Sequence, residues 1–250
     1  MFQPIHCGLF FGREQVEQVR RQAARSPYQQ AWEKLANLSV SGILAAQRDG
    51  LLYRFGDNAN AGRLAAAALE YFLGQPLRQS GQDLDSLGET VIAAQVVELV
   101  RDHPDLSAQM RAQLIESLVA RAEALHAPIG KRGYREWLWA GLARMAMGIV
   151  AEDESAFADA VHVFQQAVAE DIHPRGHIVP AVATGDGTSM EHTLIAIKAL
   201  VLMAAAAQQV GVDLWSYQVR GVSVMTAAVY PMYYFYVTDK WAWDELTPEQ

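Results

Sequence analysis

Apolar residues recur every three to four positions along most of this chain, which is the spacing of one face of an α-helix. Breaks that contain glycine or proline separate the helical stretches. The pattern predicts helices over residues 13–25, 27–38, 58–73, 85–102, 107–125, 134–151, 153–169, 189–210 and 215–236. No stretch alternates apolar and polar residues in the way that a half-buried strand does. Short breaks between long helices are typical of helical hairpins in series, so we expect an all-α fold.

The lengths of these hairpins favour a particular architecture. The hairpins are unequal and their inner helices are rich in alanine, which fits an (α/α) toroid or an incomplete α/α barrel better than a four-helix bundle. An irregular helical bundle stays open as the alternative. No unit repeats at a fixed period, which argues against a solenoid with a readable consensus. With 250 residues the chain has ample core for one large domain, and we expect residues 1–250 to form it.

Composition excludes several classes of protein. A hydrophobic fraction of 51% excludes a disordered chain, and a net charge of −8 argues against general nucleic-acid binding. The longest apolar stretch, residues 196–211, contains Lys198 and reads as a buried core helix, so no membrane contact is expected. Residues 1–12 lack the features of a signal peptide, which predicts a cytoplasmic protein unless a leader precedes them. A single cysteine, Cys7, excludes an internal disulfide.

The first break with a polar cluster leads into the helix predicted at residue 134. It combines three cations with a tyrosine and two tryptophans: Lys131, Arg132, Tyr134, Arg135, Trp137 and Trp139. Cations and free N–H groups at the start of a helix favour an anionic ligand, and arginine binds a carboxylate through two parallel hydrogen bonds. The tryptophans can stack on sugar rings. The alternative is a solvated basic turn followed by core tryptophans.

The second polar break contains His173, Arg175 and His177 and leads into a glycine-rich stretch, residues 185–193. Two histidines without a third ligand at a suitable spacing do not predict a zinc site. The stretch ends in Glu191 and His192, in the first turn of an apolar helix. An imidazole with a pKa near 6.5 can transfer protons at neutral pH. A hydrogen-bonded structural histidine is the alternative.

Several segments together resemble the alginate-lyase-like polysaccharide lyases, whose domain is an (α/α) toroid. The resemblance rests on the start 6–11 with the helix that follows it, on 137–157, on His192-Thr193 with the apolar helix that runs into 211–215, and on the aromatic tail 233–249. It covers most of the chain. Two positions depart from the family pattern. An Asn-His pair is replaced by residues 132–135, and Glu191 stands where many members have a tyrosine beside the histidine.

The resemblance implies β-elimination at a 4-linked uronate, with an anionic polysaccharide or oligosaccharide as the partner and no metal or organic cofactor. Arg132 or Arg135, with Lys131 in support, would neutralise the uronate carboxylate. His192 would act as the base, oriented by Glu191. Tyr134 would act as the acid. The further substrate-binding residues would be Trp137, Trp139, Arg175 and His177.

Two other functions stay open on the same fold. One is a non-catalytic carbohydrate-binding or scaffold protein. The other is a glycoside hydrolase, which needs two carboxylates about 5–10 Å apart across a cleft. Asp186 paired with Glu191 or with Asp57 is the candidate for that arrangement. A truncated or divergent member of the lyase family fits the two departures.

Overall fold

The computed structural model describes residues 2–76, 84–126 and 133–245. Within these ranges the chain is helical, with two isolated β-bridges and no extended strand. The helices are α1 (Arg13–Gln22), α2 (Tyr28–Ala36), α3 (Ile43–Gly56), α4 (Ala59–Leu73), α5 (Leu84–Val100), α6 (Ala108–His126), α7 (Tyr134–Val150), α8 (Glu154–Gln166), α9 (Val179–Val182), α10 (Ser189–Gln208) and α11 (Val224–Tyr236). The all-α prediction is therefore confirmed.

Three helices differ from the prediction. The sequence pattern gave no helix over residues 43–56, where the structure has α3, and none over residues 179–182, where it has the short α9. The last helix was predicted from residue 215, but α11 begins at Val224. The segment before it turns instead, because Gly211 and Gly221 adopt positive φ angles and Val219 and Val222 exchange backbone hydrogen bonds of 3.0 and 2.9 Å.

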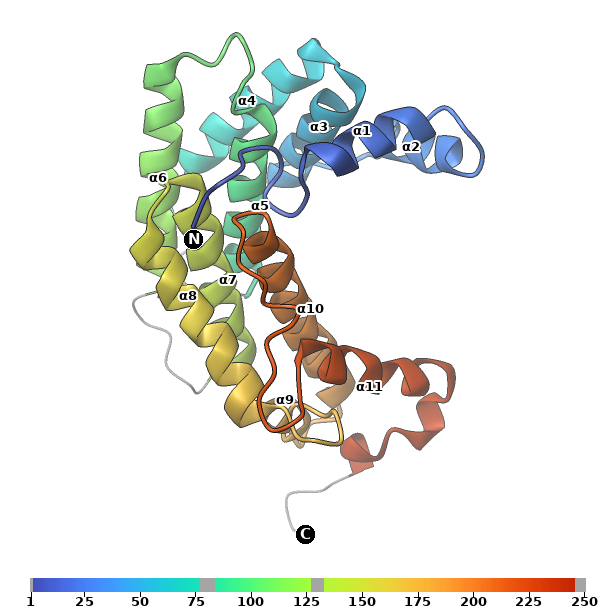
Figure 1. The fold of residues 1–250 in the computed structure, drawn as a ribbon. Helices are drawn as coiled ribbons and strands as arrows, with labels where there is room; N and C mark the ends of the chain where they lie inside the picture. Colours follow the sequence, from blue (N-terminus) through green and yellow to red (C-terminus); the bar gives the residue numbers. More distant parts are fainter. Residues whose placement is uncertain (1, 77–83, 127–132, 246–250) are drawn as a thin grey trace.

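Four helices, α3, α5, α7 and α10, form a row in which neighbours run parallel (Figure 1). Along this inner row, moving towards the C-terminus of one helix also moves its contacts towards the C-terminus of the neighbouring helix. The contacts are Gln47 to Gln95 (2.6 Å), Arg54 to Asp102 (2.8 Å), Gly88 to Trp139, Arg101 to the carbonyl of Val150 (3.0 Å), and Trp139 to the carbonyl of Ile195 (3.2 Å). All four helices therefore begin at the same end of the molecule.

The outer helices α4, α6 and α8 return antiparallel to the inner row and complete the hairpins (Figure 1). The row curves from α1 and α2 at one end to α11 at the other, which gives the incomplete (α/α) toroid that the sequence predicted. One hydrophobic core runs between the two layers and includes Leu99, Leu142, Phe164 and Leu200, each at most 2% exposed. The core fixes the inner row, and thereby the common end at which its helices begin.

The N-terminal segment, residues 2–12, lies across the opposite end, where the inner helices finish. Gln3 donates its backbone N–H to the carbonyl of Val210 at 3.1 Å, and Leu9 is 2% exposed. His6 bridges two carboxylates there, with Nδ1 3.0 Å from Glu98 and Nε2 3.1 Å from Glu152. Arg101 lies 3.0 and 3.2 Å from the same two carboxylates. This ion-pair network holds the segment on the inner row, far from the starts of the helices.

Helix α10 is, among the described residues, the one helix long and apolar enough to cross a membrane. Half of that apolar stretch is buried inside the protein, where α10 packs against α7, α9 and α11. Its first residue, Ser189, accepts a hydrogen bond of 2.7 Å from the indole N–H of Trp241. The C-terminal segment is thereby tied to the start of α10.

Candidate active site

The starts of α7 and α10 lie together because the two helices run parallel and are joined by the bond from Trp139 to Ile195. Arg135 belongs to the first turn of α7 and His192 to the first turn of α10. Arg135 is close enough for its charge to lower the pKa of His192. The structure therefore brings Arg135 close to Glu191 and His192. Tyr134 begins the same helix as Arg135, with its hydroxyl beside Asp171.

The electrostatic surroundings of His192 keep its imidazole neutral at neutral pH. Burial lowers the pKa of this half-buried histidine most, and the charge of Arg135 lowers it further. The carboxylates of Asp186, Glu191 and Glu136 act in the opposite direction without cancelling the effect. A neutral imidazole has a free lone pair, so His192 is able to accept a proton.

Tyr134 presents its hydroxyl to the interior. The oxygen is buried, and burial followed by the nearby charge of Asp171 raises the pKa of Tyr134 well above 10. Asp171 ends a π-helical turn, Ala167–Asp171, that follows α8. The ring of Tyr134 lies 5.8 Å from that of Trp137, which packs against the core. The phenol therefore stays protonated across the physiological pH range.

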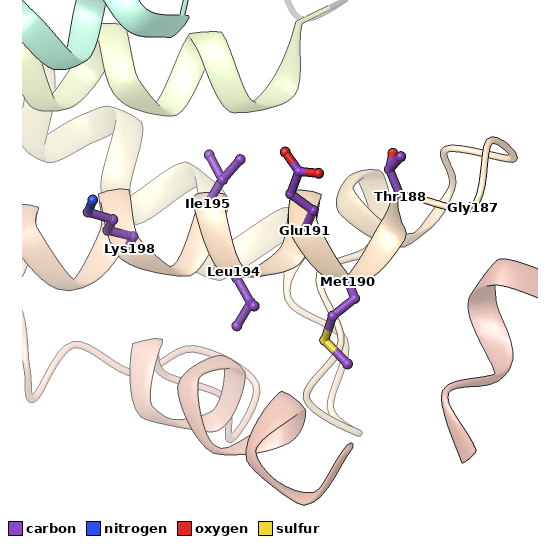
Figure 2. Close-up of a pocket in the computed structure, with 7 residues that line it drawn as sticks. All are labelled: Gly187, Thr188, Met190, Glu191, Leu194, Ile195 and Lys198. Atoms are coloured by element: carbon purple, nitrogen blue, oxygen red, sulfur yellow. The ribbon is translucent and has the colours of Figure 1, made fainter. Parts of the chain in front are cut away.

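Two open cavities lie along the inner row near the starts of its helices. The first, of about 500 Å³, follows α10, and we call it the α10 cavity. It is lined by Gly187, Thr188, Met190, Glu191, Leu194, Ile195 and Lys198 (Figure 2). The second, of about 560 Å³, lies between α3 and α5 and includes Trp139, and we call it the α3–α5 cavity. Both are lined by Ile195 and Lys198, so they meet at this point of α10.

The glycine-rich loop closes the outer end of the α10 cavity. Gly185 and Gly187 adopt positive φ angles of 67° and 78°, which turn the chain into α10. Asp186 between them accepts hydrogen bonds from the backbone N–H and the hydroxyl of Thr188, at 3.0 and 2.5 Å. These bonds lower the pKa of Asp186 to about 2, so the carboxylate is ionised near His192.

The two tryptophans predicted to bind sugar lie at the edge of the site. Trp139 is 8% exposed and forms part of the wall of the α3–α5 cavity. Trp137 lines neither cavity. The ring of Trp137 packs instead against that of Tyr134.

The second polar break lies apart from the two cavities. The ring of His177 stacks on that of His173 with 4.4 Å between centroids, and Trp243 lies 4.7 Å from it. Burial, followed by the charges of His173 and Arg175, lowers the pKa of His177. Arg175 is exposed, and neither it nor His177 lines either cavity. In the described ranges no three His, Cys, Asp or Glu side chains are arranged to hold a metal ion.

Lys131 and Arg132 lie outside the described residues. Asp57 follows the last residue of α3 and pairs with Arg20 at 2.5 Å, so it lies at the end of the inner row opposite to Asp186. The hydrolase pair of Asp57 with Asp186 is therefore wrong, because the two carboxylates do not share a cleft.

The sequence interpretation did not include three charged residues that line the cavities: Asp85, Glu89 and Lys198. For Lys198 the sequence does contain a signal, in the spacing of residues along its helix. Glu191, Ile195 and Lys198 are spaced by four and three residues, which places them on one face of a helix. Asp85 and Glu89 come from α5, and only the packing of α5 beside α7, and of α7 beside α10, brings them to the site.

Comparison with solved structures shows the same fold in alginate lyases. Alginate lyase A1-III from Sphingomonas species A1 is 16% identical with a TM-score of 0.72, covering 90% of this chain and 65% of that chain. A histidine-to-alanine variant of A1-III complexed with a tetrasaccharide is 17% identical with a TM-score of 0.72, covering 90% and 63%. An alginate lyase from Bacteroides ovatus is 11% identical with a TM-score of 0.69, covering 91% and 83%.

At these identities the likeness to the solved structures is one of fold, and this chain spans less than two thirds of the length of A1-III. No curated protein sequence matches the chain significantly. The model of a protein family described as alginate lyase, however, matches residues 50–243, from α3 to the C-terminal aromatic segment. The chain therefore belongs to the alginate lyase family.

Proposed function

We propose that this protein is a polysaccharide lyase that cleaves a uronate-containing polymer, such as alginate, by β-elimination. The observation that carries the proposal is the pairing of the first turns of α7 and α10, which places Arg135 near His192 and next to the α10 cavity. One residue supplies a cation for a carboxylate and the other a base. Membership of the family supports the reaction class, and the tetrasaccharide in the A1-III complex supports an oligosaccharide as the ligand.

The chemistry requires both groups. The proton on C5 of a uronate is too weakly acidic to remove while the adjacent carboxylate keeps its full charge. Arg135 hydrogen-bonds that carboxylate and stabilises the negative charge that develops on it. His192 then takes the C5 proton, and the electron pair of the C5–H bond forms the C4=C5 double bond. The C4–O4 bond breaks, and O4 leaves with a proton from an acid.

Glu191 and Tyr134 complete the assignment. Glu191 precedes His192 and raises its pKa, against the effect of Arg135, so it keeps the imidazole basic enough to accept a proton. Tyr134 is the acid, because its raised pKa keeps the hydroxyl protonated until O4 departs. No step requires a metal or an organic cofactor.

The remaining predicted residues extend the binding surface. Lys131 and Arg132 precede α7 in the sequence and add positive charge for a polyanion. Trp139 forms part of the wall of the α3–α5 cavity. Trp137 supports Tyr134 from the core side. Arg175 and His177 contact only a polymer long enough to pass beyond the two cavities.

The decisive experiment is incubation with a panel of polyuronates: polymannuronate, polyguluronate, polygalacturonate and polyglucuronate. A lyase produces the ultraviolet absorbance of the unsaturated product with at least one of them, and His192→Ala abolishes it. Reducing ends without that absorbance would identify a glycoside hydrolase. Binding without either signal would identify a carbohydrate-binding protein. Either of these two results would overturn the lyase proposal.

A further inference from the structure

Lys198 lies where the α10 cavity and the α3–α5 cavity meet. It follows Glu191 by seven residues and Ile195 by three, so the three side chains share one side of α10, as Figure 2 shows. It is the one cationic side chain among the described residues that line the two cavities. An anionic group of a ligand in this part of the groove therefore has Lys198 as its cationic partner.

The side chain of Lys198 is held in place but its charge is not neutralised. Its Nζ lies 5.5 Å from the centroid of the Trp139 ring, a cation–π contact. Trp139 is itself fixed by its hydrogen bond to the carbonyl of Ile195. The ammonium is exposed, and no ion pair of Lys198 is found in the described part of the chain.

The acidic residues described on the neighbouring wall make interactions of their own and form no ion pair with Lys198. Glu89 on α5 lies 3.8 Å from Arg121, which offsets its charge. Asp85 lines the same wall one turn earlier, at the start of α5, and makes interactions of its own. The α10 cavity contains no carboxylate other than Glu191, which lies about two turns from Lys198 along the helix.

Lys198 lies at a different place along the groove from the proposed reaction centre. It follows His192 by six residues, which is about 9 Å along the axis of α10. The side chains of Arg135, in the first turn of α7, and of Lys198 therefore start at different levels along the groove. A polymer lying along α10 places the carboxylates of two different sugar residues at the two positions.

We propose that Lys198, positioned on Trp139, forms a separate subsite for the carboxylate of an acidic sugar residue beyond the one that is cleaved. The inference rests on the proposed function in taking the ligand to be a uronate polymer along α10. Lys198 contributes to binding and not to the chemical step. It favours polymers that carry a carboxylate on this sugar residue over polymers with a neutral sugar there.

The test compares Lys198→Gln, Lys198→Arg and the wild type in binding to oligouronates of increasing length, measured by titration calorimetry. Lys198→Gln weakens binding of a hexamer by about fivefold, the effect of losing one exposed ion pair. Lys198→Arg keeps the charge and the affinity. A dimer, which fills only the reaction centre, binds the wild type and both variants with equal affinity. The difference disappears at 1 M salt because exposed charges are screened.

Two controls separate charge from packing. Lys34→Gln removes an exposed lysine on α2, a helix that lines neither cavity, and leaves hexamer binding unchanged. A neutral oligosaccharide of the same length binds wild type and Lys198→Gln alike. Equal loss of affinity for charged and neutral oligomers would mean that Lys198 only shapes the groove, and it would overturn the subsite.

The outcomes also distinguish the subsite from the lyase proposal. If the wild type binds oligouronates without cleaving them, and Lys198→Gln binds the hexamer more weakly, the lyase activity is refuted and the subsite stands. If cleavage occurs and Lys198→Gln leaves the KM of long substrates unchanged, the subsite is refuted and the lyase stands. A wild type that neither binds nor cleaves refutes both.

Discussion

Trp139 donates its indole N–H to the carbonyl oxygen of Ile195 at 3.2 Å, and this bond joins α7 to α10 about one turn below Arg135 and His192. Trp139 is only 8% exposed, and a hydrogen bond in such low-dielectric surroundings is stronger than one in water. It fixes how far α7 is displaced along α10. The distance between the proposed carboxylate-binding arginine and the proposed base therefore depends on a core tryptophan.

The first prediction concerns the base. His192→Ala should lower lyase turnover by about 100-fold or more, the usual scale for a lost general base. The free energy of unfolding should change by less than about 0.5 kcal/mol, because the side chain is half-buried at a helix start. Steady-state kinetics and urea unfolding on the same preparation give both values. A destabilised protein whose folded fraction keeps its activity would identify a structural histidine.

The second prediction concerns the pH dependence of turnover. His192 must be neutral to act as a base, so turnover falls as the pH drops through its pKa, which lies below 6.5. Arg135→Gln removes a positive neighbour, so the pKa of His192 rises and the acid limb moves to higher pH. Glu191→Gln removes a negative neighbour, so the limb moves to lower pH.

The two shifts can be measured without catalysis, by following the imidazole C–H resonances of His192 during a pH titration. Shifts of opposite sign in the two variants are expected. Shifts of the same sign, or none, would mean that Arg135 and Glu191 do not act on His192 as the structure places them.

The third prediction concerns the acid. Tyr134→Phe keeps the ring that packs against Trp137 and removes the hydroxyl. Turnover should fall by about 100-fold if this phenol protonates O4. Stability should be unchanged or slightly higher, since a buried polar group beside Asp171 is lost. Full activity in Tyr134→Phe would assign the acid to another group.

How far the sequence predicted the fold can be seen in α3. Its buried residues include Asp49 and Gly50, so an apolar periodicity is missing. Asp49 is tolerated because Arg48 pairs with it at 2.7 Å. Gly50 is needed because a Cβ there would lie 3.0 Å from Leu99 of α5. Both reasons depend on neighbours in three dimensions, which a pattern along the chain does not contain.

The candidate site divides in the same way. The alignment of Glu191, Ile195 and Lys198 follows from helical spacing alone and was open to prediction. The approach of Arg135 to His192 depends on α7 and α10 running parallel as neighbours. Local sequence places each residue in the first turn of a helix, but the pairing of those helices is set by the packing of the whole inner row.

A fourth prediction concerns stability at the opposite end of the inner row. The hydrogen bond to Glu98 raises the pKa of His6 most, against the effect of burial. A raised folded-state pKa contributes stability that is fully present below pH 6.5, the unfolded value, and is lost as the pH rises through the folded value. His6→Gln should lose about 1–3 kcal/mol at pH 6 and progressively less at higher pH.

Urea unfolding of wild type and His6→Gln at several pH values tests this, with His162→Gln, an exposed position on α8, as the matched control. The control should follow the wild type throughout. A gap between wild type and His6→Gln that stays constant from pH 6 to pH 9 would show that His6 acts through packing rather than through its charge.

The last prediction compares two glycines of the inner row. A Cβ at Gly148 of α7 would lie 2.8 Å from the backbone nitrogen of Phe157 and 3.1 Å from the carbonyl of Asp153, so Gly148→Ala should destabilise the protein by about 1–3 kcal/mol. At Gly88 of α5 the nearest atom is 3.7 Å away, in Trp139. Gly88→Ala should therefore stabilise by about 0.4–1 kcal/mol, because alanine restricts the unfolded chain. Thermal unfolding of the two variants should give shifts of opposite sign. A neutral Gly148→Ala would mean that α7 and α8 approach each other less closely than the structure places them.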